Sequence, residues 1–171
     1  MSELERWETR YAATGYHFGK EPNAFLKSKA HLLKAGRKAL SVADGEGRNS
    51  VFLAELGLDV RAMDFSPNAL AKARALAKER GATVRFERAD LETWQWPVGE
   101  FDLVVAIFIQ FCPPGLRARV FDGMKRALKP GGLILMQGYR PEQLKYKTGG
   151  PSQVEQLYTR ELLETAFADC V

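Results

Sequence analysis

The chain has 171 residues, of which 46% are hydrophobic and 27% are charged, and its formal net charge at pH 7 is +4. This length and composition are typical of one globular domain and exclude a disordered or fibrous chain. No apolar run approaches the ~20 residues of a membrane helix, and the charged residues 1–6 lack the apolar core of a signal peptide. Cys112 and Cys170 have no motif spacing. We therefore expect reduced thiols in a cytoplasmic protein with no membrane partner.

Residues 1–22 are rich in aromatic side chains, and small and turn-forming residues follow Tyr11. This pattern predicts a short helix and a loop at the edge of the core, and a lid over a ligand is the functional alternative. Asn23 is a good N-cap, and the apolar spacing after it predicts a helix that runs to about Leu33.

From residue 39 onward, strand patterns alternate with helix patterns. Short apolar runs predict strands at residues 39–43, 59–63, 83–88, 101–107 and 133–137. Apolar spacing and capping residues predict helices at residues 49–56, 67–80, 115–128 and 160–168. The glycines and proline of residues 129–132 predict a turn before the last strand. Strands joined through helices form a parallel sheet with helices on both faces, so we expect a doubly wound α/β fold.

The first predicted strand ends in Asp44-Gly45-Glu46-Gly47, and a helical pattern follows directly. Two glycines this close let the backbone bend sharply and let a ligand approach it, and the helix N-terminus offers free N–H groups to the same point. In doubly wound sheets, nucleotide-like ligands bind at this turn. An ordinary glycine turn is the alternative, and the turn alone does not decide between them.

Three aspartates, Asp44, Asp64 and Asp90, each follow a predicted strand and therefore share the carboxyl edge of the sheet. Asp64 lies 19 residues after Gly45, which is the spacing of a carboxylate that accepts hydrogen bonds from a ribose diol. The alternative for Asp64 is a charge that favours the next helix N-terminus. Asp90, followed by Leu91, is placed to meet an adenine edge, and a turn aspartate is its alternative.

A dinucleotide fingerprint would place a third glycine where this chain has Ser50. The glycine turn, Asp64, Asp90, the apolar strand at 101–105 and the segment 128–132 together resemble the class I S-adenosylmethionine-dependent methyltransferases. The resemblance covers residues 36–138. It implies a single methyltransferase domain over residues 1–171, with S-adenosylmethionine as cofactor and a mostly parallel, Rossmann-like sheet. Residues 36–138 then form the cofactor-binding core, and residues 139–158 form a substrate loop.

The resemblance also implies roles for individual residues. The glycine turn approaches the methionine and sugar portions of the cofactor, Asp64 the ribose, and Asp90 with Leu91 the adenine. The residues expected at the cofactor are Ala43, Asp44, Gly45, Gly47, Asn49, Asp64, Phe65, Ser66, Asp90, Leu91 and Ile107. The chain shows no metal-ligand spacing, and no metal is expected.

Three further segments narrow the resemblance. Tyr16-x-Phe18-Gly19-x-x-Pro22-Asn23, the turn at residues 45–49 and Tyr146-x-Thr148-Gly149-Gly150-Pro151 are similar to the tellurite-resistance methyltransferase group. In that group the aromatic N-terminal segment is similar to a lid, so residues 1–22 are expected to form a lid here. The resemblance implies a small acceptor such as a tellurite-, selenite- or thiol-like nucleophile.

The chain departs from the family pattern in two respects. Many class I members carry an acidic residue where this chain has Ser41 and a glycine where it has Ala43. Asp44, Glu46 or the Ala43 carbonyl could replace the missing acid in holding the methionine ammonium. The family sheet usually has seven strands, and we expect the last two to be absent from this chain, through truncation.

The acceptor side offers four candidates, which are Tyr16, Gln110, Arg140 and Tyr146. Gln110 has the alternative role of a loop-capping amide, and Arg140 that of a solvated charge. The residue before the proline pair at 113–114 is a cysteine rather than the Asn or Asp of enzymes that methylate amino groups of nucleic acid, so nucleic acid is not the expected partner. The alternatives are an RNA- or protein-directed methyltransferase and a binding module without catalysis. We expect a monomer or a weak homodimer.

Overall fold

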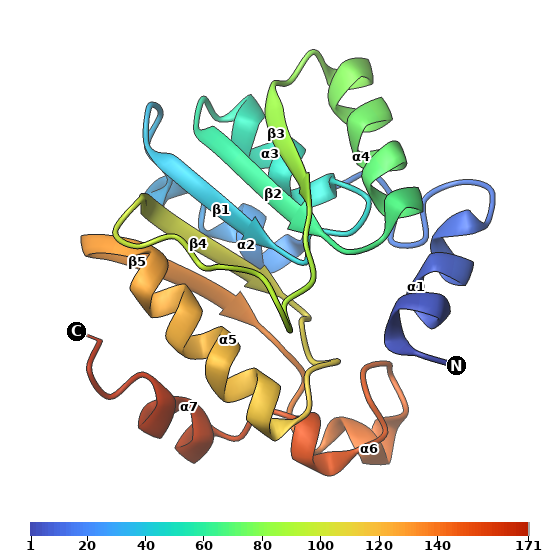
Figure 1. Ribbon diagram of the computed structural model, residues 1–171, viewed down its shortest axis with the longest axis vertical. Coiled ribbons are helices and arrows are strands. Elements are labelled where there is room, and N and C mark those ends of the chain that lie inside the picture. Colours follow the sequence, from blue (N-terminus) through green and yellow to red (C-terminus); the bar gives the residue numbers. More distant parts are fainter. Residues whose placement is uncertain (171) are drawn as a thin grey trace.

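The computed structural model describes residues 1–170 and contains one sheet of five parallel strands, with the order β3-β2-β1-β4-β5 (Figure 1). The strands are β1 (Lys38–Val42), β2 (Asp59–Asp64), β3 (Val84–Arg88), β4 (Phe101–Ile107) and β5 (Leu128–Gln137). This topology confirms the predicted doubly wound α/β fold. The strand order reverses between β1 and β4, and such a reversal opens a crevice at the carboxyl ends of the two strands.

Helices cover both faces of the sheet. The helices α3 (Arg48–Glu55) and α4 (Pro67–Arg80) pack on one face, and α5 (Pro114–Ala127) and α7 (Arg160–Ala166) pack on the other. In Figure 1, α5 lies in front of the sheet and α3 behind it. β4 is buried over nearly its whole length because it lies between these two layers.

The N-terminal segment forms a longer helix than the sequence pattern suggested. α1 (Glu3–Ala12) begins with a capping box, in which the Glu5 N–H donates to the Ser2 hydroxyl and the Ser2 N–H donates to the Glu5 carboxylate. Its buried face carries Tyr11, which stacks on Trp7 with ring centroids 5.5 Å apart. α1 packs against α4, beside the carboxyl edge of the sheet (Figure 1).

The predicted helix between Asn23 and Leu33 is broken in two. Asn23 caps α2 (Ala24–Ser28) as expected, but the chain then forms a short 3-10 turn, η1 (Ala30–Leu32). The Ser28 hydroxyl donates to the Phe25 carbonyl at 2.7 Å. Such side-chain hydrogen bonds to the backbone compete with a continuing α-helix.

Residues 129–132 are not a turn that precedes the last strand. The strand β5 already begins at Leu128, which pairs with Phe101, and the next pair joins Leu133 to Leu103. Residues 129–132 therefore bulge out of the edge strand, with Gly131 at φ +76°. The long segment after β5 contains α6 (Gln143–Tyr146) and a 3-10 turn, η2 (Val154–Gln156).

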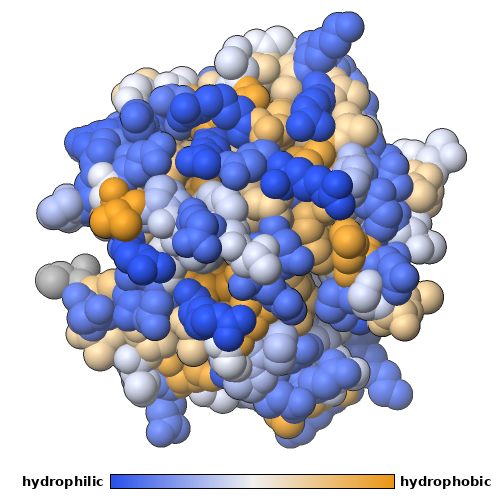
Figure 2. Space-filling view, viewed as in Figure 1, coloured by the Kyte–Doolittle hydropathy of each residue, from blue (hydrophilic) through white to orange (hydrophobic). Residues whose placement is uncertain are grey.

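Figure 2 shows a mostly hydrophilic face, on which apolar side chains form small separate patches. No helix among residues 1–170 has the length and apolar character needed to cross a bilayer.

Candidate cofactor and acceptor site

Two adjacent cavities lie at the carboxyl edge of the sheet. The larger, of about 810 Å³, is bounded by the glycine turn, the ends of β1 and β4, the N-terminal segment and residues 148–153. The smaller, of about 330 Å³, lies beside the ends of β2 and β3 and the first turn of α1. The residues that border both cavities are Ala43, Asp64, Phe65 and Phe111. One long ligand can therefore span the two cavities, along the crevice that the topology predicts.

Asp64 ends β2 at the junction of the two cavities. Its carboxylate accepts hydrogen bonds from the backbone N–H groups of Gly45 and Ser66, each at 2.9 Å. Only 3% of the residue is exposed, and this burial raises its pKa to about 6. Each carboxylate oxygen can accept two hydrogen bonds, so Asp64 keeps acceptor capacity for a ligand diol.

Asp44 lies beside Ser41, the residue that stands where many class I methyltransferases carry an acidic side chain. Its carboxylate accepts hydrogen bonds from the Ser41 hydroxyl at 2.7 Å and the Ser50 hydroxyl at 2.5 Å. Burial raises the pKa of this carboxyl group, against the opposing effect of these hydrogen bonds. Ala43 before it adopts φ +47°, a conformation in which glycine carries no penalty. Of the three possible substitutes for the family acid, Asp44 is therefore the carboxylate that adjoins Ser41, and its partners are hydroxyl groups rather than a cation.

Glu46 is committed to the protein itself. Its carboxylate accepts from the Lys72 ammonium at 3.0 Å and from the His17 backbone N–H at 2.7 Å. Only 2% of the Glu46 side chain is exposed. It therefore holds the N-terminal segment rather than offering a free charge to a ligand.

The two glycines of the turn have different roles. Gly45 borders the larger cavity at φ +66°, and a Cβ there would lie 3.0 Å from the Tyr11 hydroxyl. Gly47 borders neither cavity, and a Cβ there would lie 2.8 Å from the Cα and Cβ atoms of Ala73 on α4. The expectation that Gly47 leaves room for the ligand is therefore not supported. Gly47 instead allows close packing of the turn against α4.

The smaller cavity has a mostly apolar wall that suits a flat ring. Leu91 is buried there, together with Ala89 and Leu116. Asp90 is exposed at its edge and accepts from the Glu92 N–H at 2.9 Å. Phe65 and Phe111 stack at its border with the larger cavity, with centroids 6.0 Å apart.

Most residues expected at the cofactor border a cavity. Those at the larger cavity are Ala43, Asp44, Gly45, Asn49, Asp64, Phe65 and Ile107, and those that the smaller one adds are Asp90 and Leu91. Ser66 borders neither cavity. Its hydroxyl caps α4 by accepting from the Ala69 N–H at 3.0 Å and donates to the Glu8 carboxylate.

Of the four residues expected at the acceptor, only Gln110 borders the larger cavity. Its amide donates to the carbonyls of Tyr139 and Gln156 and accepts from the Tyr139 N–H, which is the loop-capping alternative. Arg140 is 76% exposed and pairs with Glu142 at 2.6 Å, outside both cavities. An acceptor role for Arg140 is therefore not supported.

The remaining two acceptor candidates also lie outside both cavities. Tyr146 is 73% exposed. The hydroxyl of Tyr16 donates to the Lys72 carbonyl at 3.0 Å. The N-terminal helix and the glycine turn, rather than these residues, supply the wall of the larger cavity.

The cavity wall includes cations that the sequence reasoning did not single out. Arg6, Arg10 and Arg48 border the larger cavity. Arg10 lies over the Trp7 ring at 4.8 Å, and Arg48 donates to the Phe18 carbonyl at 3.3 Å. Among the described residues 1–170, neither Arg10 nor Arg48 forms an ion pair.

The sequence does contain a signal for the N-terminal helix that carries Arg6 and Arg10. This signal is the S-x-x-E capping box at residues 2–5.

Comparison with known proteins identifies the family of this chain. Residues 39–132, more than half of the chain, match the family described as "Methyltransferase domain". The chain belongs to this family. The two cavities therefore have to accommodate S-adenosylmethionine, the cofactor that this family and the structural neighbours indicate.

Individual relatives cover less of the chain. The chain is 33% identical over 126 residues to a ribosomal protein L11 methyltransferase and 34% identical over 117 residues to a demethylmenaquinone methyltransferase, both from Thermus thermophilus. These matches cover 73% and 64% of this chain but only 46% and 50% of the relatives, so the chain spans about half their length. A TehB-like SAM-dependent methyltransferase from Corynebacterium glutamicum shares the fold. Its TM-score is 0.67 at 22% identity, and the match covers 96% of this chain and 78% of the other.

The residues at the edge fit S-adenosylmethionine. The apolar slot beside Leu91 suits the adenine, and Asp64 at the junction of the cavities suits the ribose hydroxyls. The larger cavity offers the carboxylate of Asp44 to an ammonium and the guanidinium of Arg10 or Arg48 to a carboxylate. A zwitterionic amino acid joined to a nucleoside requires this set of partners.

Proposed function

We propose that this chain transfers a methyl group from S-adenosylmethionine to a small-molecule acceptor. The observation that carries the proposal is the position of α1, whose residues border both cavities and roof the glycine turn. A roof made from the chain's own N-terminus leaves space for a molecule of tens of atoms beside the cofactor. Such a roof favours a small acceptor over a nucleic-acid helix or a folded protein domain.

S-adenosylmethionine, when bound, supplies a methyl group on a sulfonium that is already activated for displacement. The residues of this chain then have to hold the ligand, orient the acceptor and exclude water. Asp64 and Asp44 hold the ribose and amino groups. Gln110 fixes Tyr139, whose ring stacks on Phe108 at 4.6 Å beside the larger cavity. α1 excludes water from above.

The acceptor class in this proposal is a small anionic or soft nucleophile, such as tellurite, selenite or a thiol. Support comes from the guanidinium groups of Arg10 and Arg48 on the cavity wall, neither of which forms an ion pair within residues 1–170. If one of them binds the carboxylate of the cofactor, the other is available to an anionic acceptor in place of Arg140. Arginine binds oxyanions in a bidentate manner.

The test is an activity screen with a labelled methyl donor on the chain. Tellurite, selenite and small thiols are compared with bulk RNA and with bulk protein, and label is followed in each pool. We expect label in the small-molecule pool, and one of the two variants Arg10→Gln and Arg48→Gln should raise the KM for that acceptor more than it raises the Kd for S-adenosylhomocysteine. Label in RNA or protein alone would contradict the proposed acceptor class.

Two other outcomes have specific motives. The relative named as a ribosomal protein L11 methyltransferase makes label in protein the first alternative. The departures at Ser41 and Ala43 motivate a module that binds S-adenosylmethionine without turnover. Calorimetric binding of S-adenosylhomocysteine without label in any pool would favour that module.

A further inference from the structure

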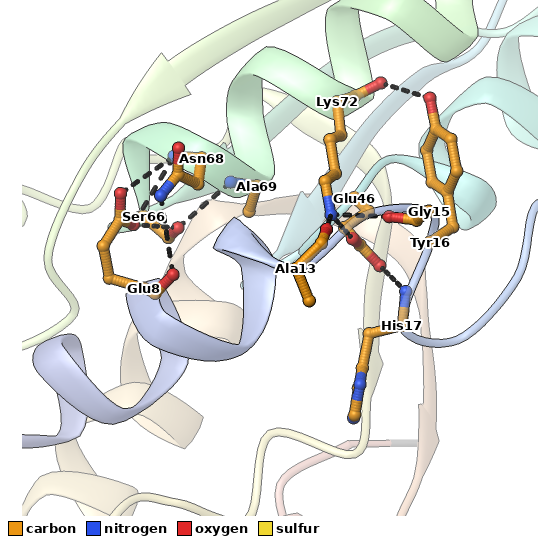
Figure 3. A network of polar contacts seen from close by, with 10 residues as sticks. All are labelled: Glu8, Ala13, Gly15, Tyr16, His17, Glu46, Ser66, Asn68, Ala69 and Lys72. Carbon is orange, nitrogen blue, oxygen red and sulfur yellow. Dashed lines mark hydrogen bonds and ion pairs between the residues drawn. The ribbon is translucent and has the colours of Figure 1, made fainter.

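Lys72 on α4 borders neither cavity, yet its side chain holds the segment that roofs them. Its ammonium donates to the Ala13 carbonyl at 2.7 Å, the Gly15 carbonyl at 2.6 Å and the Glu46 carboxylate at 3.0 Å (Figure 3). An ammonium has three N–H donors. All three are therefore used, two on the N-terminal segment and one on the glycine turn.

A second layer of hydrogen bonds surrounds this ammonium. The Tyr16 hydroxyl donates to the Lys72 carbonyl, and the His17 backbone N–H donates to the carboxylate oxygen of Glu46 that Lys72 leaves free. Figure 3 shows the Lys72 and Glu46 side chains meeting between α4 and the N-terminal segment, where the backbone of His17 joins them. The Lys72 and Glu46 side chains are only 21% and 2% exposed, so solvent screens the pair weakly.

The same contacts reach the cofactor side of the turn. Glu46 directly follows Gly45, whose N–H is held by Asp64 at 2.9 Å. Both Gly45 and Glu46 border the larger cavity. A displacement of the turn therefore alters the attachment of residues 13–17, and release of those residues alters the turn.

We propose that Lys72 is a positioning residue that couples docking of the N-terminal segment, residues 3–17, to the glycine turn. The docked segment then controls how fast a ligand leaves the cavities. The inference rests on the proposed function, because the ligand it concerns is the cofactor. Coupling between two sites is reciprocal. If docking of the segment raises the affinity for the ligand by a given factor, binding of the ligand raises the equilibrium constant for docking by the same factor.

The test compares wild type with Lys72→Met by hydrogen exchange, with and without S-adenosylhomocysteine, and by stopped-flow dissociation of that ligand. Without ligand, exchange in residues 1–20 should be faster in the variant while exchange in β1 and β4 is unchanged. Dissociation should be roughly tenfold faster, since a loss of about 1.4 kcal/mol in coupling corresponds to that factor. In the wild type, ligand should slow exchange in the segment, and in the variant this protection should shrink.

Two further variants test whether the effect is specific to the contacts of Lys72. Lys78→Met removes an exposed lysine from the same helix and should match the wild type in both measurements. Tyr16→Phe removes a single hydrogen bond of the docked segment and leaves the Lys72–Glu46 pair intact. It should accelerate exchange in the same residues, by less than Lys72→Met does.

The outcomes separate the coupling from the proposed function. Unchanged exchange of residues 1–20 in ligand-free Lys72→Met, or dissociation within twofold of wild type, overturns the coupling. Faster exchange that extends over β1 and β4 also overturns it, because it assigns Lys72 a general role in stability. If the wild type does not bind S-adenosylhomocysteine, the proposed function fails, and local opening in the ligand-free variant still supports docking through Lys72.

Discussion

At the scale of single residues, Asp64 links the fold to ligand binding through its charge. Burial raises its pKa to about 6 even though two backbone N–H groups hold the charged form. Below this pH the folded protein carries a protonated Asp64, and the carboxylate needed by a ribose diol is lost. Because the raised value belongs to the folded state, stability contributed by Asp64 is present at low pH and falls as the pH rises through about 6.

Affinity for S-adenosylhomocysteine should therefore rise with pH, whereas the contribution of Asp64 to folding stability falls. We expect binding at pH 5 to be roughly tenfold weaker than at pH 7, as one pKa unit implies. Calorimetry on wild type and Asp64→Asn measures this, and the variant should bind weakly and depend less on pH between pH 5 and 7 than the wild type does. Asp59→Asn, at the other end of β2, should keep the wild-type profile. A wild-type affinity independent of pH would remove the Asp64 charge from the site.

Gly47 illustrates a residue whose role is in packing. Its φ is +90°, and a Cβ there would lie 2.8 Å from Ala73. Gly47→Ala should lower the free energy of unfolding by about 2–5 kcal/mol, from backbone strain of about 1–2 kcal/mol and overpacking of about 1–3 kcal/mol. Urea unfolding measures the change. Gly81→Ala is the matched control, because Gly81 has φ +65° and open space around it. Equal losses in the two variants would exclude the clash with α4.

At the scale of elements, α5 is positioned by a tryptophan on the segment that precedes β4. Trp96 lies over Gly123 so closely that a Cβ would fall 2.3 Å from its ring, and Trp94 packs edge-on against Trp96 at 4.9 Å. Glycine in the middle of α5 is unfavourable for the helix itself. The close approach of the indole is the packing reason for glycine at this position.

Gly123→Ala should therefore destabilise the protein by about 1–3 kcal/mol despite the better helix propensity of alanine. It should also shift the tryptophan emission, because Trp96 has to move. Gly115→Ala, at the start of the same helix with open space around it, should be neutral or stabilising by up to about 1 kcal/mol. Thermal unfolding followed by fluorescence tests both variants, and stabilisation by Gly123→Ala would contradict the packing described for Trp96.

At the scale of the whole molecule, ligand binding joins elements that are distant in sequence. The cavities are bounded by α1, the ends of β1 and β4, and residues 148–153. A ligand that spans them ties the N-terminal segment, the sheet and the loop after α6 into one unit. Any ligand that binds only the folded state stabilises it by mass action.

S-adenosylhomocysteine at 100 times its Kd should stabilise the fold by about 2.7 kcal/mol, which raises Tm by about 5–10 °C for a domain of this size. NADH, the ligand of the other common doubly wound class, should leave Tm unchanged, since Ser50 stands where its fingerprint needs glycine. Scanning calorimetry with the two ligands at matched concentrations measures both shifts in Tm. A shift with NADH and none with S-adenosylhomocysteine would reverse the choice of ligand.

The sequence by itself determined the alternating strands and helices of this protein. The period of apolar residues identified the five strands and the main helices, and Ser66-Pro67 marked the start of α4. The glycine turn and Asp64 were identified as neighbours from a spacing of 19 residues, and they form a hydrogen bond of 2.9 Å. These features are readable because burial periodicity, capping and strand-end chemistry are properties of short stretches of chain.

Only the tertiary structure decided where the irregular segments and their side chains lie. Glu8 contacts Ser66 at the start of α4, which is 58 residues away in the sequence. Lys72 contacts Ala13 and Gly15, which are 59 and 57 residues away. Arg140 turns to Glu142 and solvent. The direction of a loop side chain depends on contacts made far along the sequence, which no local pattern contains. The sequence predicted a lid over residues 1–22, but which of its side chains border the cavities depends on how α1 packs against the edge of the sheet.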